Sequence, residues 1–212
     1  MLDHDGVVVD SFEIFTTAFL EGCRRVGLPQ IATADDVLAL FEGNFYESLR
    51  VAGADDAQIS AAMRRTADVL RIAISALRPF PLMPEVLAEL GEARHLVIVS
   101  SNARGVVELF LKRHGIAGVA EVVGAEAGRS KVAKVGALIA RFPGQARYWF
   151  VGDTAGDMRE ARLAGATPLG VAWGWHGREQ LEEAGAERIA ETPADLLAIV
   201  APELTADFLG TG

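Results

Sequence analysis

After residue 84, short apolar segments alternate with longer segments of helical periodicity. The apolar segments cover residues 96–99, 119–123, 148–151 and 168–173. Strands that alternate with helices form right-handed crossover units, in which the strands run parallel and the helices cover both faces of the sheet. This pattern predicts an α/β fold with a doubly wound parallel sheet.

The segment from residue 12 to residue 78 has a different pattern and is predicted to be helical throughout. Apolar residues recur at helical spacing over 12–26 and again over 55–77. Residues 78–84 contain three prolines, which exclude a helix interior and stiffen a connection. We therefore expect two domains: an α/β catalytic core made of residues 1–11 and 79–212, and a small all-helical domain of residues 12–78.

Composition limits the partners and the compartment. The 212 residues carry 20 Lys and Arg against 29 Asp and Glu, a formal charge of -9, so most of the surface would repel a nucleic acid. Cys23 is the only cysteine, and we expect it to be a buried thiol rather than half of a disulfide. No apolar run reaches the roughly 18 residues that a membrane span needs. These observations predict a cytoplasmic protein that binds neither nucleic acid nor membranes.

Asp3 resembles a residue at the carboxyl end of a strand, yet only Met1 and Leu2 precede it. Strands usually contain about five or six residues. Either the first strand is short or the natural start of the chain lies upstream.

Polar residues follow three of the predicted strands, where ligands of open α/β sheets collect. Between the second and third of these groups, a lysine-containing segment begins a predicted helix. The groups are Asp3-His4-Asp5-Gly6, Ser100-Ser101-Asn102 and Gly152-Asp153-Thr154-Ala155-Gly156-Asp157, and the lysine segment is Ser130-Lys131-Val132-Ala133-Lys134.

These residue types suit phosphoryl transfer. Asp3 and Asp153, with help from Asp157, would hold a hard cation, and Mg²⁺ is expected because it binds through few carboxylates and keeps several waters. A free oxygen of Asp3 would attack phosphorus and form an aspartyl-phosphate. Asp5 would protonate the leaving oxygen and later deprotonate water.

Three further residues and a lysine would bind the substrate. Ser100 would hydrogen-bond a phosphoryl oxygen, with Ser101 and Asn102 beside it, and a lysine would neutralise the negative charge. Lys131 is preferred over Lys134 because it stands at the helix start, directly after Ser130.

Each group taken alone has a structural interpretation. Asp-x-Asp-Gly is typical of a turn, and Ser100 or the Gly-Asp-x-x-x-Asp segment can begin a helix. The functional interpretation depends on all four groups occurring in one chain, each at a strand end or helix start.

With these four groups in this order, the chain resembles the haloacid dehalogenase (HAD) superfamily from end to end. The resemblance implies a Rossmann-like core, a helical cap inserted after the first motif, and phosphatase activity similar to that of phosphoglycolate phosphatases. It also implies that Asp3, the backbone carbonyl of Asp5, Asp153 and Asp157 surround the Mg²⁺ ion. The segment from Gly170 to His176 is similar to the family's last strand and loop.

Two residue types near the motifs are expected to be structural. His4 alternates away from the site if it belongs to a strand. Trp173, Trp175 and His176 border the site only if they do not pack in the core, which is the default for tryptophan.

The resemblance leaves two other functions open. Family members without an acid at the position of Asp5 dehalogenate or cleave carbon–phosphorus bonds, so Asp5 favours phosphoryl transfer. Sugar phosphomutases of the family have a cap histidine about ten residues further on, where this chain has Ile14-Phe15-Thr16. The prediction is a phosphatase acting on a small phosphorylated metabolite, with the phosphomutase and a catalytically silent metabolite-binding relative as alternatives.

The substrate and the assembly remain open at this stage. Asn44, Tyr46, Arg50 and Arg64 are candidate contacts to the leaving group. The aromatic residues Phe12, Phe15 and Phe19, with Ile14, are expected to fill the core of the helical domain. The protein is expected to be a monomer or a homodimer.

Overall fold

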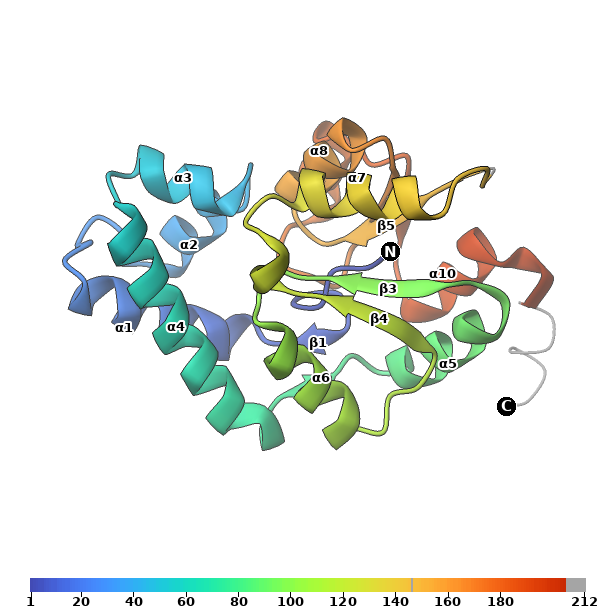
Figure 1. Cartoon of the computed structure of the whole chain (residues 1–212), viewed down its shortest axis with the longest axis horizontal. Coiled ribbons are helices and arrows are strands. Elements are labelled where there is room, and N and C mark those ends of the chain that lie inside the picture. Colours follow the sequence, from blue (N-terminus) through green and yellow to red (C-terminus); the bar gives the residue numbers. More distant parts are fainter. Residues whose placement is uncertain (146, 205–212) are drawn as a thin grey trace.

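A parallel sheet forms the centre of the computed structural model, which describes residues 1–145 and 147–204 (Figure 1). Its strands lie in the order β4-β3-β5-β6-β7, and the first residues of the chain lie between β3 and β5. The strands are β3 (Leu96–Val99), β4 (Val119–Val123), β5 (Trp149–Gly152), β6 (Thr167–Val171) and β7 (Arg188–Ala190).

The short N-terminal segment joins the two halves of this sheet. The Leu2 amide donates to the Val97 carbonyl (2.9 Å), and the Asp3 amide donates to the Val151 carbonyl (2.8 Å). Val151 in turn donates its amide to the Met1 carbonyl (2.9 Å). Two residues before Asp3 are therefore enough to hold this residue at the carboxyl edge of the sheet, between two buried strands.

Helices cover both faces of the sheet (Figure 1). In this view α7 (Lys131–Arg141) and α8 (Ala155–Leu163) lie above it, and α5 (Met83–Ala93) and α6 (Arg104–Arg113) lie below. The other helical elements that follow β3 in the chain are η2 (Ala125–Ala127), α9 (Arg178–Glu183), α10 (Pro193–Val200) and η3 (Pro202–Leu204). The arrangement is the predicted α/β fold with a parallel sheet.

Three strand predictions differ from the structure in detail. β5 begins and ends one residue later than predicted, and β6 ends at Val171 because Ala172 and Trp173 turn away toward the loop. β7 was not predicted. Of its three residues only Ile189 and Ala190 are apolar, so the segment is too short to show a period.

Residues 12–75 are mostly helical, in α1 (Phe12–Arg25), α2 (Ala34–Leu40), α3 (Phe45–Val51), α4 (Asp56–Ile72) and η1 (Ala73–Ser75). Thr33 and Asp55 begin α2 and α4 with capping boxes. Helices α1 and α4 pack closely because Gly22 has no side chain: a Cβ there would lie 3.2 Å from the Ala62 carbonyl oxygen. Cys23 is fully buried, as predicted.

The two ends of this helical segment lie side by side. β1 (Val9–Asp10) pairs with β2 (Arg78–Pro79) as a short antiparallel ladder, with Val9 opposite Pro79. The proline-rich stretch is therefore a paired connection and not only a spacer. No described residue from 12 to 77 belongs to the central sheet. None of the helices in 1–145 and 147–204 is both long and apolar enough to cross a membrane.

Candidate active site

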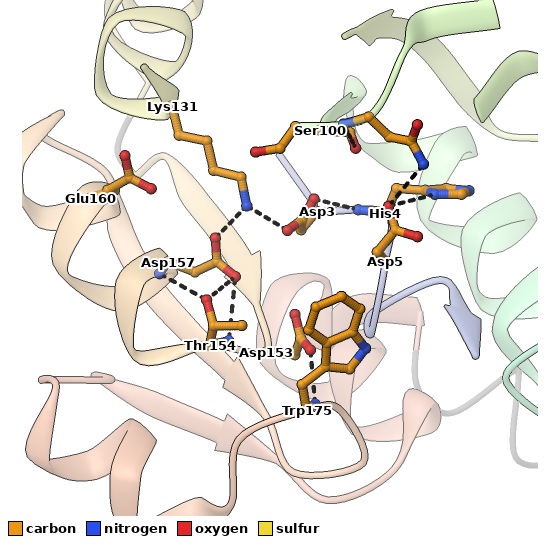
Figure 2. A network of polar contacts seen from close by, with 12 residues as sticks. Asp3, His4, Asp5, Ser100, Lys131, Asp153, Thr154, Asp157, Glu160 and Trp175 are labelled. Atoms are coloured by element: carbon orange, nitrogen blue, oxygen red, sulfur yellow. Dashed lines mark hydrogen bonds and ion pairs between the residues drawn. The ribbon is translucent and has the colours of Figure 1, made fainter. Parts of the chain in front are cut away.

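The carboxyl ends of the central strands bring the predicted polar residues together (Figure 2). Asp3 follows Leu2, Ser100 follows β3, and Asp153 follows β5. Lys131 is the first residue of α7. Because parallel strands all end at the same edge, residues more than 100 positions apart in the sequence meet in one pocket.

Three carboxylates form the centre of the site. Asp3, Asp153 and Asp157 are buried, and one oxygen from each lies within 4.8 Å of the others. Burial, followed by the charges of Asp157 and Asp3, raises the pKa of Asp153 well above its usual value. Burial also raises the pKa of Asp3 to about 6, although Lys131 opposes this shift. The fold therefore holds the three carboxylates close together against their mutual electrostatic repulsion.

Lys131 is the cation within this cluster (Figure 2). Its Nζ donates to Asp3 Oδ2 and to Asp157 Oδ1, both at 2.5 Å. Burial would lower the pKa of Lys131, but the charges of Asp157 and Asp3 raise it well above its usual value. The amine is therefore protonated at neutral pH, between the two carboxylates.

Asp157 has a second role at the start of α8. Its Oδ2 accepts a hydrogen bond from the Thr154 hydroxyl (2.8 Å), and its own amide donates to Thr154 Oγ1 (3.2 Å). This capping box fixes the carboxylate, so that Oδ1 is directed at Lys131.

Lys134 faces a different part of the structure. Its Nζ donates to the backbone carbonyls of Ser100 (2.7 Å) and Gly124 (3.1 Å). Burial, with a smaller contribution from Lys131, lowers the pKa of Lys134 to about 8. Lys134 thus supports the backbone behind Ser100, whereas Lys131 contacts the carboxylates.

Two glycines leave the space that Asp153 occupies. Gly6 has φ +75, and a Cβ there would lie 1.8 Å from Asp153 Oδ2. A Cβ on Gly174 would lie 2.2 Å from the Asp153 Cβ. Any side chain at either position would displace the carboxylate, and at Gly6 it would also strain the backbone.

Asp5 lies beside the carboxylate cluster in its own hydrogen-bond network. It accepts from the Ser11 hydroxyl (2.7 Å) and, more weakly, from the Asn102 amide (3.5 Å). His4 Nδ1 lies 3.4 Å from Asp5 Oδ2, the same oxygen that Asn102 contacts, while the His4 ring packs edge-on against Phe110. Burial alone would raise the pKa of Asp5, but the His4 ring and the two hydrogen-bond donors lower it overall.

The segment after β3 contributes both side chain and backbone. Ser100 is buried, and its Oγ accepts a hydrogen bond from the backbone N–H of Asn102 (2.9 Å). The hydroxyl proton of Ser100 is therefore free to be donated to a ligand. Ser101 and Asn102 also line the pocket.

Trp175 lies at the pocket, which the sequence did not favour. Its backbone amide donates to Asp153 Oδ2 (2.8 Å), and its ring packs on Phe15 and Phe41. Trp173 instead donates its indole N–H to the Val7 carbonyl (3.2 Å). The tight approach of Gly174 to Asp153 positions this loop, and it is a tertiary contact that the sequence does not show.

The pocket has a charged floor and an apolar roof. The floor consists of Asp3, Asp5, Ser100, Lys131 and Asp153, and the roof consists of Phe15, Phe41, Phe45, Met63 and Trp175. Phe15 and Phe19 both pack in the hydrophobic core, as expected, but the Phe15 ring also lines the pocket whereas Phe19 does not. The cavity between floor and roof is small, about 30 Å³, and has room for ordered water.

The four candidate leaving-group residues occupy different places. Asn44 donates to the buried Glu160 on α8 (2.7 Å), and the Tyr46 hydroxyl donates to the Ser101 carbonyl (3.2 Å). Arg50 pairs with Glu47 and Asp56 on the surface, away from the pocket. Arg64 lines a second cavity next to the pocket.

The sequence matches the family described as haloacid dehalogenase-like hydrolase over residues 1–171. The chain belongs to this family. The match begins at the first residue and covers the helical segment as well as the strands that carry Asp3, Ser100 and Asp153.

Similar proteins include other members of the family. The phosphoglycolate phosphatase of Synechococcus elongatus is 32% identical over 205 residues, which cover 94% of this chain and 95% of that protein. Among solved structures, a haloacid dehalogenase-like hydrolase from Streptococcus pneumoniae has a TM-score of 0.70 at 22% identity, covering 94% of this chain and 96% of its own. A hydrolase from Pseudomonas syringae has a TM-score of 0.72 at 22% identity, with 95% and 96% covered.

These comparisons confirm three predictions. The family is the haloacid dehalogenase superfamily, the fold is α/β with a Rossmann-like parallel sheet, and the enzyme is a phosphatase of this family. The two structural relatives bear on the fold alone.

The acid cluster of this HAD-like protein suits a divalent cation. Its donors are all carboxylate oxygens, which hard cations prefer. Three buried carboxylates face one ammonium group, and the raised pKa values of Asp3 and Asp153 show that a further positive charge would relieve repulsion.

Proposed function

We propose that the protein is a Mg²⁺-dependent phosphatase that hydrolyses a small phosphomonoester through an aspartyl-phosphate on Asp3. The observation that carries the proposal is the buried cluster of Asp3, Asp153 and Asp157 with Lys131 bridging two of its members. A structural ion pair would need only one acid for one lysine. An excess of buried carboxylates is costly for stability and is typical of a functional site.

In the first step, an oxygen of Asp3 attacks phosphorus and the bond from phosphorus to the ester oxygen breaks. Asp5 gives its proton to the leaving oxygen. In the second step, Asp5 takes a proton from water, which attacks the same phosphorus, and the bond to Asp3 breaks to release phosphate. Ser100 and Lys131 hold the phosphoryl oxygens during both steps.

Asp3, Asp153, Asp157 and the backbone carbonyl of Asp5 are the proposed Mg²⁺ ligands. When bound, the ion supplies positive charge that screens the carboxylates from the incoming phosphate and stabilises the charge that develops on it.

The lowered pKa of Asp5 constrains the origin of the first proton. Asp5 is ionised at neutral pH in the free protein, which suits its role as base in the second step. To act as acid first, it must take up a proton as the substrate binds. A phosphomonoester with a second pKa near 6 carries such a proton in its monoanionic form.

We further propose that residues 12–78 are a cap domain that opens to admit the substrate. The small cavity of about 30 Å³ supports this, because the roof side chains Phe15, Phe41, Phe45 and Met63 from this segment lie over the polar floor. The paired strands β1 and β2 at the two ends of this segment are suited to act as the hinge, since they bring both connections to one place.

The roof favours hydrolysis over a mutase reaction. A mutase has to hold a sugar hydroxyl in line for attack on the aspartyl-phosphate. The side chains from the helical segment that line the pocket are Phe15, Phe41, Phe45 and Met63, and none of them accepts a proton or a strong hydrogen bond. Water next to Asp5 is then the group that accepts the phosphoryl group from Asp3.

The test uses a generic chromogenic phosphomonoester, 2-phosphoglycolate and a panel of sugar monophosphates, each with Mg²⁺ and with a chelator. 2-Phosphoglycolate is included because a 32% identical relative is a phosphoglycolate phosphatase. We expect Mg²⁺-dependent release of phosphate. Isomer formation faster than phosphate release would favour the mutase, and no turnover of any ester would favour a silent binding protein.

A further inference from the structure

A second cavity of about 270 Å³ adjoins the catalytic pocket, and we call it the antechamber. It is bounded by Tyr46, Ser60, Met63 and Arg64 on α3 and α4, and by Asn102 and Arg129 on the α/β side. Met63 and Asn102 line both cavities. The antechamber is therefore the space into which a group attached to the phosphoryl position would extend.

The position of Asp5 indicates which part of the substrate would extend into the antechamber. Asn102 donates its side-chain amide to Asp5 (3.5 Å), the proposed proton donor to the leaving oxygen. A leaving group protonated by Asp5 therefore lies next to Asn102, on the side that opens into the antechamber.

The antechamber is positively charged, in contrast to the chain as a whole. Its lining includes two arginines, Arg64 and Arg129, and none of the described residues that line it is acidic.

Arg129 is held in a defined orientation. Its guanidinium donates to Asp56 (2.6 Å) and to the Ser60 hydroxyl (2.8 Å), and it lies over the Tyr46 ring at 5.3 Å. The same Asp56 oxygen also accepts from Arg50 (3.0 Å), so one carboxylate is shared by two arginines. Glu47 is the second partner of Arg50, so two arginines and two carboxylates form one network that fixes the Arg129 guanidinium at the edge of the antechamber.

We infer that Arg129 is a specificity-determining residue that recognises an anionic group, such as a carboxylate, on the leaving group of the substrate. The inference rests on the proposed phosphatase function and names the class of substrate: phosphomonoesters whose leaving group carries a second negative charge. A guanidinium with fixed orientation binds a carboxylate through two parallel hydrogen bonds, which neither Tyr46 nor Ser60 can supply.

Two pairs of substrates test this inference, because the leaving group ends in a carboxylate in one member of each pair and in a neutral hydroxymethyl group in the other. They are 3-phosphoglycerate with glycerol 3-phosphate, and 2-phosphoglycolate with 2-hydroxyethyl phosphate. We expect kcat/KM to favour the carboxylate member in at least one pair. In Arg129→Gln this preference should fall by at least about tenfold, the scale of one lost hydrogen bond to a charged group.

Two further variants separate recognition from structure. Arg129→Lys keeps the positive charge but loses the planar pair of donors of the guanidinium, so it should retain more of the preference than Arg129→Gln does. Arg50→Gln removes the other arginine on Asp56, which lies outside both cavities, and should leave the preference unchanged.

The outcomes divide clearly. Equal kcat/KM for both members of each pair in the parent protein would overturn the inference, as would an Arg129→Gln variant that loses activity on both members equally. In both cases the phosphatase proposal would stand. If no ester in the set is hydrolysed, including the chromogenic one, the phosphatase proposal fails and this inference fails with it.

Discussion

The floor and the roof of the catalytic pocket are made in opposite ways. The floor consists of polar side chains, most of them ionisable, at strand ends and a helix start of the α/β part. Lys131 joins Asp3 of the floor to Asp157 behind it through ion pairs of 2.5 Å. The roof consists of large apolar side chains, four from the helical segment and Trp175 from the loop after β6. Within the roof the contacts are between rings, for example Phe41 with Phe45 at 4.6 Å.

This difference indicates a division of labour. In the proposed mechanism the floor supplies the reacting groups and depends on fixed charges, so a change of one atom there should have a large effect. The roof excludes water and shapes the space, and ring contacts tolerate substitution by other apolar residues. Substitutions in the two layers should therefore differ both in size and in the kinetic constant they change.

Asp3→Asn should have the largest effect. The amide keeps the shape but cannot attack phosphorus, so turnover should fall by roughly ten-thousandfold or more, the scale for loss of a covalent nucleophile. Acid quenching during turnover of a radiolabelled substrate should trap phosphoprotein from the parent but not from this variant. Circular dichroism provides the control for folding. Undiminished turnover would contradict the covalent mechanism.

Lys131→Met should follow. Loss of the ammonium group removes the charge that holds phosphoryl oxygens, and kcat should fall by about a hundred- to a thousandfold. It also leaves Asp3 and Asp157 buried without their cation, which should lower the free energy of unfolding by about 3 to 5 kcal/mol. Added Mg²⁺ should recover part of this stability but not kcat. A variant with parental kcat would exclude Lys131 from the site.

Asp5→Asn should slow turnover by roughly a hundredfold, the range for general acid/base catalysis. The amide can neither donate a proton to the leaving oxygen nor accept one from water, so both formation and breakdown of the aspartyl-phosphate should slow. Single-turnover measurements separate the two steps. Esters with a good leaving group need no acid, so the formation step should be least affected for these. Equal slowing of formation for good and poor leaving groups would contradict the acid role.

The floor could be predicted from the sequence, and the reason is geometric. Strand ends can be recognised locally, and in a parallel sheet all carboxyl ends meet at one edge. Asp3, Ser100 and Asp153 therefore converge without any knowledge of side-chain packing. Lys131 could be preferred over Lys134 because it stands at the start of the helical pattern, directly after Ser130. In the structure the two amines have different partners, Asp3 for Lys131 and the Gly124 carbonyl for Lys134.

The roof could not be predicted, because its residues meet only through tertiary packing. Phe15 and Phe19 are one helical turn apart and look alike in the sequence, yet one lines the pocket and the other is fully buried in the core. Trp175 depends on a loop whose path is set by the contact between Gly174 and Asp153. The antechamber likewise combines α4 with a residue before α7, and periodicity does not relate these segments.

Phe15→Leu should have a small effect of a different kind. A smaller apolar side chain loosens the roof without altering charge, so kcat/KM should change by less than about tenfold, with most of the change in KM. Phe19→Leu is the matched control, because Phe19 lies on the same helix and packs against Phe15 and Phe45. Both variants should lose about 1 to 2 kcal/mol of stability, within the usual range for core substitutions. A KM change of the same size in Phe19→Leu would mean that the effect is not specific to the roof.

Lys134→Met should have the smallest effect on turnover, because Lys134 supports the Ser100 backbone from behind and does not line the pocket. Its effect should instead appear in the pH dependence of stability. Burial lowers the pKa of Lys134 from 10.5 to about 8, so the folded protein disfavours the charged amine. Below pH 8 the amine is charged in both states and the fold bears the full cost. Between pH 8 and 10.5 the unfolded state binds more protons, so this residue makes stability rise with pH.

The measurement is urea unfolding of the parent and of Lys134→Met at several pH values from 7 to 11. The free energy of unfolding of the parent minus that of the variant should increase with pH across this window, by no more than about 3 kcal/mol because one pKa unit corresponds to about 1.4 kcal/mol. Taking the difference cancels the titration of all groups that the two proteins share. The lost hydrogen bonds to Ser100 and Gly124 add only a constant offset. A difference that stays constant from pH 7 to 11, or decreases, would mean that the pKa of Lys134 is not lowered in the folded protein. The support behind Ser100 would then be a second permanent cation beside Lys131, and the contrast between the two lysines would be one of direction only.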